Sequence, residues 1–336
     1  MILTRGARVT GAVLCAVLAV IVAGWLVRDL GAVDDPAELW RYWAGYAEAR
    51  PKLMPATSPV DAAMLVVYVV AGVAALRSSV AAAALAAAGV TTLALRVPGL
   101  WNAVGSGAAA RFPDELRTRA LICTFVALAA AIALLVTAGA GRRPPRDFSE
   151  RTPSRPGRGA AVVSFLLLGA SAAVVIAWEV RQAVKYPSLY PDWYMGGDSL
   201  ALPLTDPPPG WSSAVVAFLC LFAGISALPR AAHARPFGMT AAALLLPGGI
   251  LGIARTLHYE MLGHFGQLPT EGQLTVLTWF FETLAAVVVL LALARRGFAD
   301  NNAPTLTAPQ DQGYGYGYPQ GGAFGPPPPS EPPPGW

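Results

Sequence analysis

The chain has 336 residues, of which 55% are hydrophobic and only 13% are charged. Soluble domains usually carry about 25% charged residues, so this deficit, together with long apolar runs, indicates a polytopic membrane protein and argues against a soluble enzyme or a nucleic-acid-binding domain. The formal net charge of +4 is explained by arginines in cytoplasmic loops. The three cysteines all lie inside apolar runs, which predicts neither a disulfide framework nor a cysteine metal site: Cys15, Cys123 and Cys220.

Eight apolar runs predict an all-α fold with eight transmembrane helices, because a backbone in lipid must satisfy its own hydrogen bonds. Each run approaches the roughly 20 residues that a span needs. The first run resembles a signal peptide in part, but it is longer than an h-region of about 7–15 residues, so we interpret it as a span. The runs lie at 9–27, 60–76, 80–96, 119–139, 160–179, 213–228, 238–255 and 274–294.

Arginines gather at one set of run ends, and the positive-inside rule predicts that this side is cytoplasmic, with both termini inside. The abundance of alanine and arginine suggests a bacterial protein, so the predicted location is the bacterial cytoplasmic membrane. The arginines are Arg5, Arg8, Arg77, Arg142, Arg143, Arg230, Arg235, Arg295 and Arg296.

Matched residues in the two halves predict an internal duplication. Tryptophans and arginines recur in the same order, in positions where apolar runs meet water, and such matches are harder to obtain by chance than matches of alanine. Because each half holds four spans, both halves should have the same orientation. The matched pairs are Trp25 with Trp178, Arg28 with Arg181, Trp40 with Trp193, and Arg96 with Arg255.

The domain organisation follows from this duplication. The first repeat takes residues 1–139 and the second takes 160–294. The linker at 140–159 is rich in Arg, Pro, Gly and Ser, and we expect it to be flexible and cytoplasmic. The tail at 295–336, with its Gly-Tyr stretch and proline runs, is expected to be disordered. It is either a solvated tail or a ligand for a protein partner that binds proline-rich segments.

Four arginines at the outer ends of spans are candidate contacts for anions or lipids: Arg28, Arg96, Arg181 and Arg255. One interpretation is that the guanidinium groups reach up to the lipid headgroups while their stems lie in lipid. The other is a ring of cations that binds lipid phosphate or an anionic solute.

Glu282, about eight residues into the last run, is the candidate intramembrane polar site. A carboxylate at that depth is costly, so it either bonds a neighbouring helix or serves a proton or cation. The seventh run is interrupted by Pro247, Gly248 and Gly249. This interruption indicates a kink or close helix contact, or a broken helix of the kind that transporters use. We expect Glu282 to lie towards it.

Two outer loops carry aromatic residues. Residues 38–50, "ELWRYWAGYAEAR", predict a helix in the membrane interface, and residues 188–204 are broken by Pro and Gly. Both loops are interpreted as anchors, with a lid as the alternative. His258, Glu260 and His264 cluster in the sequence, but their spacing matches no zinc-enzyme pattern, so no metal or cofactor is predicted.

Three functions remain open at this point. The favoured one is a non-enzymatic scaffold or accessory subunit. The alternative is a small transporter or an anion- or lipid-binding carrier with its site between the repeats. The third is a membrane enzyme that acts on a lipid-linked substrate through His258, Glu260 and the arginines. The only partner expected in every case is the lipid bilayer.

Overall fold

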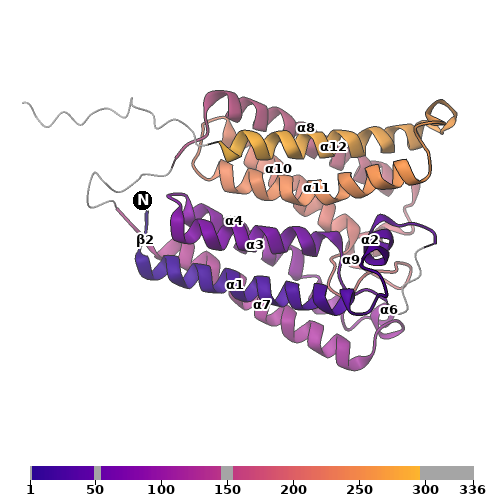
Figure 1. Cartoon of the computed structure of the whole chain (residues 1–336), viewed down its shortest axis with the longest axis horizontal. Coiled ribbons are helices and arrows are strands. Elements are labelled where there is room, and N and C mark those ends of the chain that lie inside the picture. Colours follow the sequence, from indigo (N-terminus) through magenta and orange to yellow (C-terminus); the bar gives the residue numbers. More distant parts are fainter. Residues whose placement is uncertain (1, 49–53, 145–153, 296–336) are drawn as a thin grey trace, which may run out of the picture. The chain divides into compact units, whose positions relative to one another are not determined.

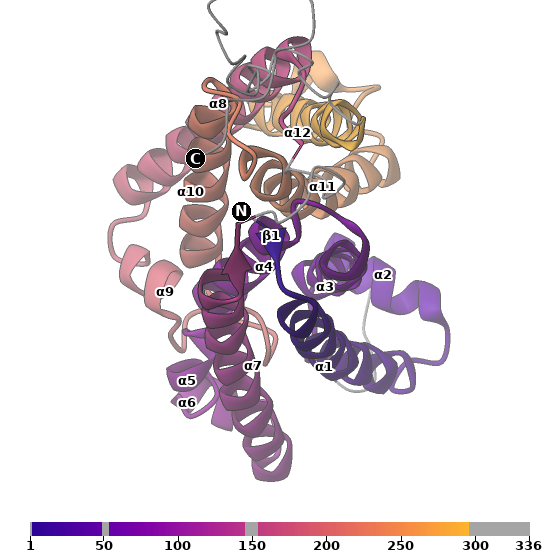
Figure 2. The same cartoon turned by 90° about the vertical axis from the view of Figure 1, so that its left-hand side faces the viewer.

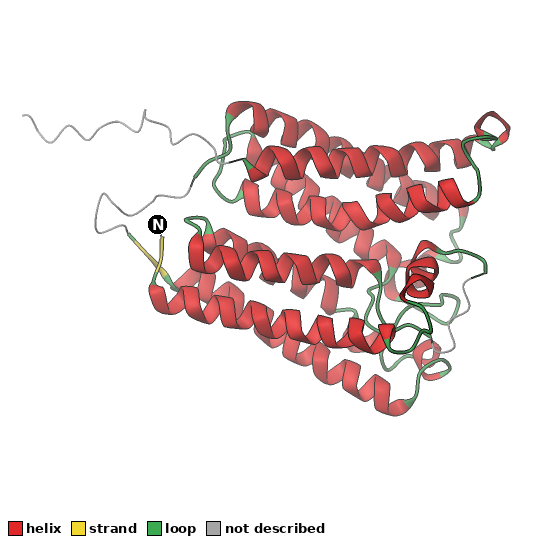
Figure 3. Ribbon diagram, viewed as in Figure 1, coloured by secondary structure: helices red, strands yellow, loops and turns green. Residues whose placement is uncertain are grey.

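The computed structural model describes residues 2–48, 54–144 and 154–295. Within these residues, eight helices are long and apolar enough to cross a membrane, which confirms the predicted number (Figures 1 and 3). They are α1 (Arg5–Leu30), α3 (Pro59–Arg77), α4 (Ala81–Arg96), α7 (Asp114–Ala140), α8 (Arg158–Lys185), α10 (Pro209–Ala227), α11 (Ala234–His258) and α12 (Thr270–Ala294).

Short elements lie at both ends of these helices (Figure 1). We call one end the loop end; it carries α2 (Pro36–Ala44), α5 (Gly99–Asn102), α6 (Ser106–Ala109), α9 (Tyr190–Met195) and the 3₁₀ helix η1 (Phe265–Gln267). The other is the terminal end, where β1 (Ile2–Leu3) pairs antiparallel with β2 (Arg142–Arg143). The predicted helix at 38–50 is confirmed in part by α2, and the predicted broken loop contains α9.

Most helices extend beyond the apolar runs because polar turns continue them. α3 begins at a capping box, in which the Ser58 side chain accepts from the backbone of the first turn and Asp61 accepts from the Ser58 N–H. Pro59 occupies the first turn, where its missing N–H costs nothing. In α7 the acidic pair Asp114 and Glu115 forms the first turn and complements the helix dipole.

The eight helices pack as two groups of four, which Figure 2 shows along their axes. In the first group α1 packs on α3, α4 packs on α7, and the contacts of α3 with α4 and of α1 with α7 complete the set. In the second group the same pairings occur between α8 and α10, α11 and α12, α10 and α11, and α8 and α12. The groups meet where α3 and α4 contact α11 and where α4 contacts α10.

Small residues allow the helices to approach closely. A Cβ on Gly89 of α4 would lie 3.0 Å from the carbonyl oxygen of Ala131 on α7. Large apolar side chains such as Val20, Ile122 and Leu166 instead remain on the surface, where their exposed fractions are 71%, 58% and 59%. Such an apolar exterior is expected of helices whose solvent is lipid.

The proline in the seventh candidate span does not break the helix. α11 is helical from Ala234 to His258 with Pro247 inside it. A Cβ on Gly249 would lie 2.9 Å from the backbone nitrogen of Thr283 and 3.0 Å from the carbonyl oxygen of Trp279. The interruption therefore corresponds to close packing of α11 on α12, which was one of the two interpretations.

The described helices all belong to one compact unit. The central part of the predicted linker, 145–153, and the predicted tail from 296 onward lie outside the described residues.

Candidate functional site

At the loop end, a segment of the second group reaches into the first group. We call residues 202–206, between α9 and α10, the strap. Its Thr205 donates from the backbone nitrogen and from Oγ1 to the carbonyl oxygen of Ala56, at 2.9 and 2.8 Å. Leu204 is buried in a cluster that includes Trp25 and Phe112. The strap thus has both polar and apolar anchors in the first group.

Arg96, at the end of α4, is the centre of a polar network beneath the strap. Its Nη2 lies 2.5 Å from Oδ1 of Asp61, and its Nη1 donates to the carbonyl oxygen of Thr205 at 2.6 Å. The other oxygen of Asp61 accepts from the Ser58 nitrogen at 3.0 Å and lies 2.8 Å from Thr205 Oγ1, whose single hydrogen is shared between this oxygen and the carbonyl of Ala56. Only 12% of the Arg96 side chain and 4% of the Asp61 side chain are exposed, so this is a buried ion pair in which Nη1 of Arg96 and Oδ2 of Asp61 have further hydrogen-bond partners.

Asp206 adds a second carboxylate next to the same guanidinium. Its Oδ1 accepts from Ser58 Oγ at 2.7 Å. Burial, and next the charge of Asp61, raise the pKa of Asp206 to about 7, while the bond from Ser58 and the charge of Arg96 oppose this rise. The network therefore contains one group that titrates near neutral pH.

Asp29, at the end of α1, organises the neighbouring loop. Its Oδ2 accepts from the backbone nitrogens of Ala56 and Thr57 at 2.9 and 2.7 Å and from Thr57 Oγ1 at 2.6 Å. Its Oδ1 lies 2.5 Å from Nη1 of Arg28. This buried carboxylate is fully bonded, which fits a structural role.

Arg255 makes the reciprocal contact from the second group to the first. Its Nε donates to the carbonyl oxygen of Ala44 at 2.8 Å, and its guanidinium carbon lies 5.7 Å from the centre of the Trp279 ring. Gly45 has a φ of 70° and faces this guanidinium, where a Cβ would collide with it. Tyr46 donates to the carbonyl oxygen of Ala254 at 3.2 Å.

All four candidate arginines thus bond within the protein. Arg28 holds Asp29, Arg96 holds Asp61 and the strap, and Arg255 holds the loop after α1. Arg181 forms an ion pair with Glu271 and lies 5.3 Å from the centre of the Trp178 ring. In the structure these guanidinium groups bond to carbonyl oxygens and carboxylates of the protein, and contact with lipid phosphate stays a prediction.

Glu282 lies apart from this network. It is half-buried and makes no hydrogen bond or ion pair with any residue that the structure describes, and it interacts electrostatically with Cys220 of α10. The Thr92 hydroxyl of α4 bonds Tyr68 at 2.9 Å and donates to the carbonyl oxygen of Ala88 at 2.7 Å, so it is bonded without Glu282. The backbone next to Gly249 faces Thr283 and Trp279.

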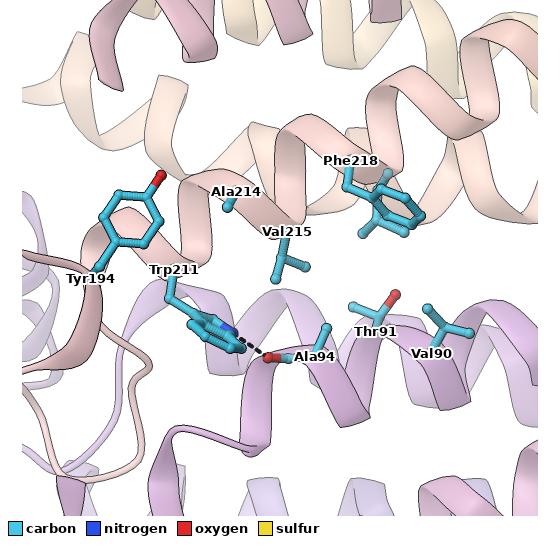
Figure 4. A pocket seen from close by; sticks show the side chains of 9 residues that line it. Val90, Thr91, Ala94, Tyr194, Trp211, Ala214, Val215 and Phe218 are labelled. Carbon is cyan, nitrogen blue, oxygen red and sulfur yellow. Dashed lines mark hydrogen bonds between the residues drawn. The ribbon is translucent and has the colours of Figure 1, made fainter. Parts of the chain in front are cut away.

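An apolar groove of about 350 Å³ runs between α4 and α10 (Figure 4). Trp211 closes its loop end by donating from Nε1 to the carbonyl oxygen of Ala94 at 2.6 Å. The Thr91 hydroxyl is buried beside it and has no hydrogen-bond partner in the part of the chain that the structure describes. Neither Glu282 nor Pro247 lines this groove.

His258 and His264 have different partners in the structure. His258 stacks on Tyr46, with ring centres 3.9 Å apart, and its Nε2 lies 2.6 Å from Oε1 of Glu48. His264 contacts the carbonyl oxygen of Glu260 at 3.5 Å. Among residues 2–48, 54–144 and 154–295, no three His, Cys, Asp or Glu side chains are placed to hold a metal ion.

Sequence reasoning missed the three carboxylates of the network: Asp29, Asp61 and Asp206. Asp61 carried a signal, since "SPVD" is a capping-box pattern before an apolar run. For Asp206 the sequence shows only an acid before a proline-rich helix start. Its partners lie more than a hundred positions away, so the local sequence could not reveal them.

The fold and this network define an all-α bundle of eight candidate membrane-spanning helices, whose two groups exchange loops at one end. In comparisons with known proteins, no family model, no curated protein and no solved structure matches the chain.

Proposed function

We propose that this protein is a non-enzymatic scaffold or accessory subunit of the bacterial cytoplasmic membrane. The observation that carries the proposal is the reciprocal exchange of loops. The loop after α1 binds Arg255 on the second group, and the strap after α9 binds Arg96 on the first. Two groups that each bond a loop of the other through buried polar contacts form one rigid unit, because separating them would leave the charged side chains without partners.

We further propose that the two groups are repeats with the same orientation. Taken in chain order, α1, α3, α4 and α7 of the first group correspond to α8, α10, α11 and α12 of the second. With this correspondence, each pair of helices in contact within one group has its equivalent in the other. The same correspondence converts the contact of α3 with α11 into that of α4 with α10. Arg96 and Arg255, which the sequence matched, both hold a loop of the opposite group. These correspondences support a two-fold axis along the helices.

The orientation proposal places the terminal end in the cytoplasm. The arginines from which the orientation was predicted, as far as the structure describes them, lie at this end: Arg5, Arg8, Arg77, Arg142, Arg143, Arg230, Arg235 and Arg295. Arg8 donates to the carbonyl oxygen of Leu76 at 3.4 Å and Arg235 to that of Ala294 at 2.9 Å, so these side chains also cap helix ends. Arginines beside so many helix ends support a cytoplasmic terminal end.

The scaffold proposal is tested by distance measurements between spin labels on the two groups. Labels at the exposed positions Ala110 and Gly263 report on the loop end, and labels at Ala140 and Leu228 report on the terminal end. A scaffold gives one narrow distance distribution for each pair in detergent, in lipid and between pH 5 and 8.

Alternating access gives the opposite result. A transporter that rocks one repeat against the other would shorten one pair while it lengthens the other. Two populations that change in this opposed way would refute the scaffold proposal. A matched pair within one group, Ala110 with Ala140, serves as the control and stays constant in both cases.

A lipid-binding carrier is the second candidate, and the groove between α4 and α10 favours it. Ala214 lines the groove, and Ala214→Trp would fill it. Native mass spectrometry of the wild type and this variant tests the proposal. Loss of a retained lipid in the variant supports a carrier, whereas equal lipid retention refutes it.

A further inference from the structure

A second cavity lies at the loop end, separate from the Arg96 network. It encloses about 230 Å³ between the segment after α4 and the segment after α9, and the strap forms part of its wall. Where glycine lines a cavity, no Cβ covers the backbone, so a ligand can approach it closely. Four glycines line this cavity: Gly105, Gly107, Gly196 and Gly197.

Opposite charges border the same space in this cavity. Arg111 donates from Nε to the carbonyl oxygen of Gly107 at 2.7 Å, and its terminal nitrogens bond to no residue that the structure describes. A Cβ on Gly107 would lie 2.8 Å from Arg111 Nη2 and 3.1 Å from Asp198 Oδ1. Ser106 holds the Asp198 carboxylate with bonds of 2.6 and 2.8 Å. The cation and the anion therefore face one space without pairing with each other.

Asn102, which carries an unused donor, is another residue of the cavity wall. The side-chain nitrogen of Asn102 is buried and has no hydrogen-bond partner among the described residues. Buried donors in proteins are nearly always bonded, so one that borders a cavity indicates an acceptor on a ligand. The ring of Trp101, whose Nε1 donates to the carbonyl oxygen of Met195 at 2.7 Å, forms an aromatic wall beside it.

We propose that this cavity binds a small zwitterion that carries an oxyanion and an ammonium group. The forked guanidinium of Arg111 and the amide of Asn102 bind the oxyanion. Asp198 binds the ammonium group, which also meets the Trp101 ring as a cation meets a π face. An anion alone would bind less well, because Asp198 would repel it.

The first experiment measures binding of phosphoethanolamine and of inorganic phosphate to the purified full chain in detergent by titration calorimetry. The wild type should bind phosphoethanolamine more tightly than phosphate. Arg111→Gln removes charge-assisted bonds and should weaken phosphoethanolamine binding about 10- to 100-fold. Asp198→Asn, at an exposed position, should weaken phosphoethanolamine binding but leave phosphate binding unchanged or tighter.

Glycine variants separate the cavity from general effects on folding. Gly107→Ala places a methyl group between Arg111 and Asp198 and should abolish binding of phosphoethanolamine. Gly266→Ala, also at the loop end, meets nothing within 4 Å and should bind as the wild type does. The proposal is overturned if phosphoethanolamine does not bind, or if phosphate binds equally well and Asp198→Asn changes neither affinity.

Vesicles distinguish the two sources of such a zwitterion. In phosphatidylethanolamine vesicles, a lipid headgroup would occupy the site and block soluble phosphoethanolamine, whereas phosphatidylglycerol vesicles would leave the site open. Blocking in the first vesicles alone identifies a lipid headgroup. Equal binding in both identifies a free solute, and either result supports a zwitterion site.

Discussion

Asp61 pairs with the Arg96 guanidinium, and Asp206 is close enough to interact with the charges of both, so the protonation of Asp206 changes the net charge of this network. Since the pKa of Asp206 is raised to about 7 in the folded protein, the folded state binds more protons than the unfolded state between about pH 4 and pH 7. The stability of the folded state is therefore highest below this range and falls as pH rises through 7.

Asp206→Asn should remove this pH dependence. Asparagine can still accept from Ser58 Oγ but cannot ionise beside Asp61. We expect the variant to be about 1–2 kcal/mol more stable than the wild type at pH 8, after allowance for solvent screening, and this difference to shrink as the pH falls from 7 towards 4. Thermal unfolding in detergent from pH 5 to 8 measures this, and parallel profiles for the two proteins would contradict it.

Arg96→Gln should be among the most damaging single changes at the loop end. It leaves the carboxylate of Asp61 buried without its cation, which costs about 3–5 kcal/mol. Adding Asp61→Asn to this variant removes the unpaired charge and should restore at least about 1 kcal/mol. Unfolding by sodium dodecyl sulfate in mixed micelles gives the free energies.

Arg119→Gln is the matched control for this prediction. Arg119 pairs with Glu115, but both side chains are mostly exposed, so we expect a change within about 0.5 kcal/mol. If Arg96→Gln changed the free energy of unfolding as little as this control does, the network would not hold the two groups together.

Glu282 makes no ion pair or hydrogen bond among the described residues, so its carboxylate is not needed for packing. Glu282→Leu should leave the unfolding temperature unchanged or raise it, because it replaces an unpaired polar group among apolar helices. Differential scanning fluorimetry in detergent measures the unfolding temperature. A marked decrease would mean that Glu282 has a bonding partner in the membrane.

At the scale of elements, α11 and α12 meet through glycine. A Cβ on Gly252 would overlap the ring of Trp279, whereas a Cβ on Gly248 would meet nothing within 4 Å. The rigid indole cannot move aside cheaply, so close packing here depends on the missing side chain.

Gly252→Ala should therefore destabilise the protein by about 1–3 kcal/mol through overpacking. Gly248→Ala, four residues away on the same helix, should be neutral or stabilising by up to about 1 kcal/mol, because it restrains the unfolded chain. Thermal unfolding of the two variants under the same conditions checks this, and equal effects would show that α11 and α12 do not approach as closely as described.

At the scale of the whole molecule, the positions of the arginines predict which end of the helices faces the cytoplasm. With the native cysteines replaced by alanine, single cysteines at Ala110 and Gly263 should react with an impermeant maleimide in intact cells. Cysteines at Ala140 and Leu228 should react only after the membrane is permeabilised. The reverse pattern would invert the orientation, and a mixed pattern would refute eight spans.

Hydrophobicity along the chain was enough to predict the eight helices, because a helix in lipid depends on the local length of an apolar run. The run at 119–139 became α7 with one added polar turn, since Asp114 and Glu115 suit a helix start. The matched Arg96 and Arg255 were recognised as special from their positions alone.

The sequence alone did not reveal which residues these two arginines bond. Arg96 bonds to Thr205 and Arg255 bonds to Ala44, contacts that span 109 and 211 positions of the chain. Composition and periodicity describe neighbours within a few turns, whereas the partner of a buried charge is chosen by how the helices pack. The sequence thus determined the helices and the residues at their ends, and only the tertiary structure decided that these arginines bind the protein's own loops, since each had to be paired once it was buried.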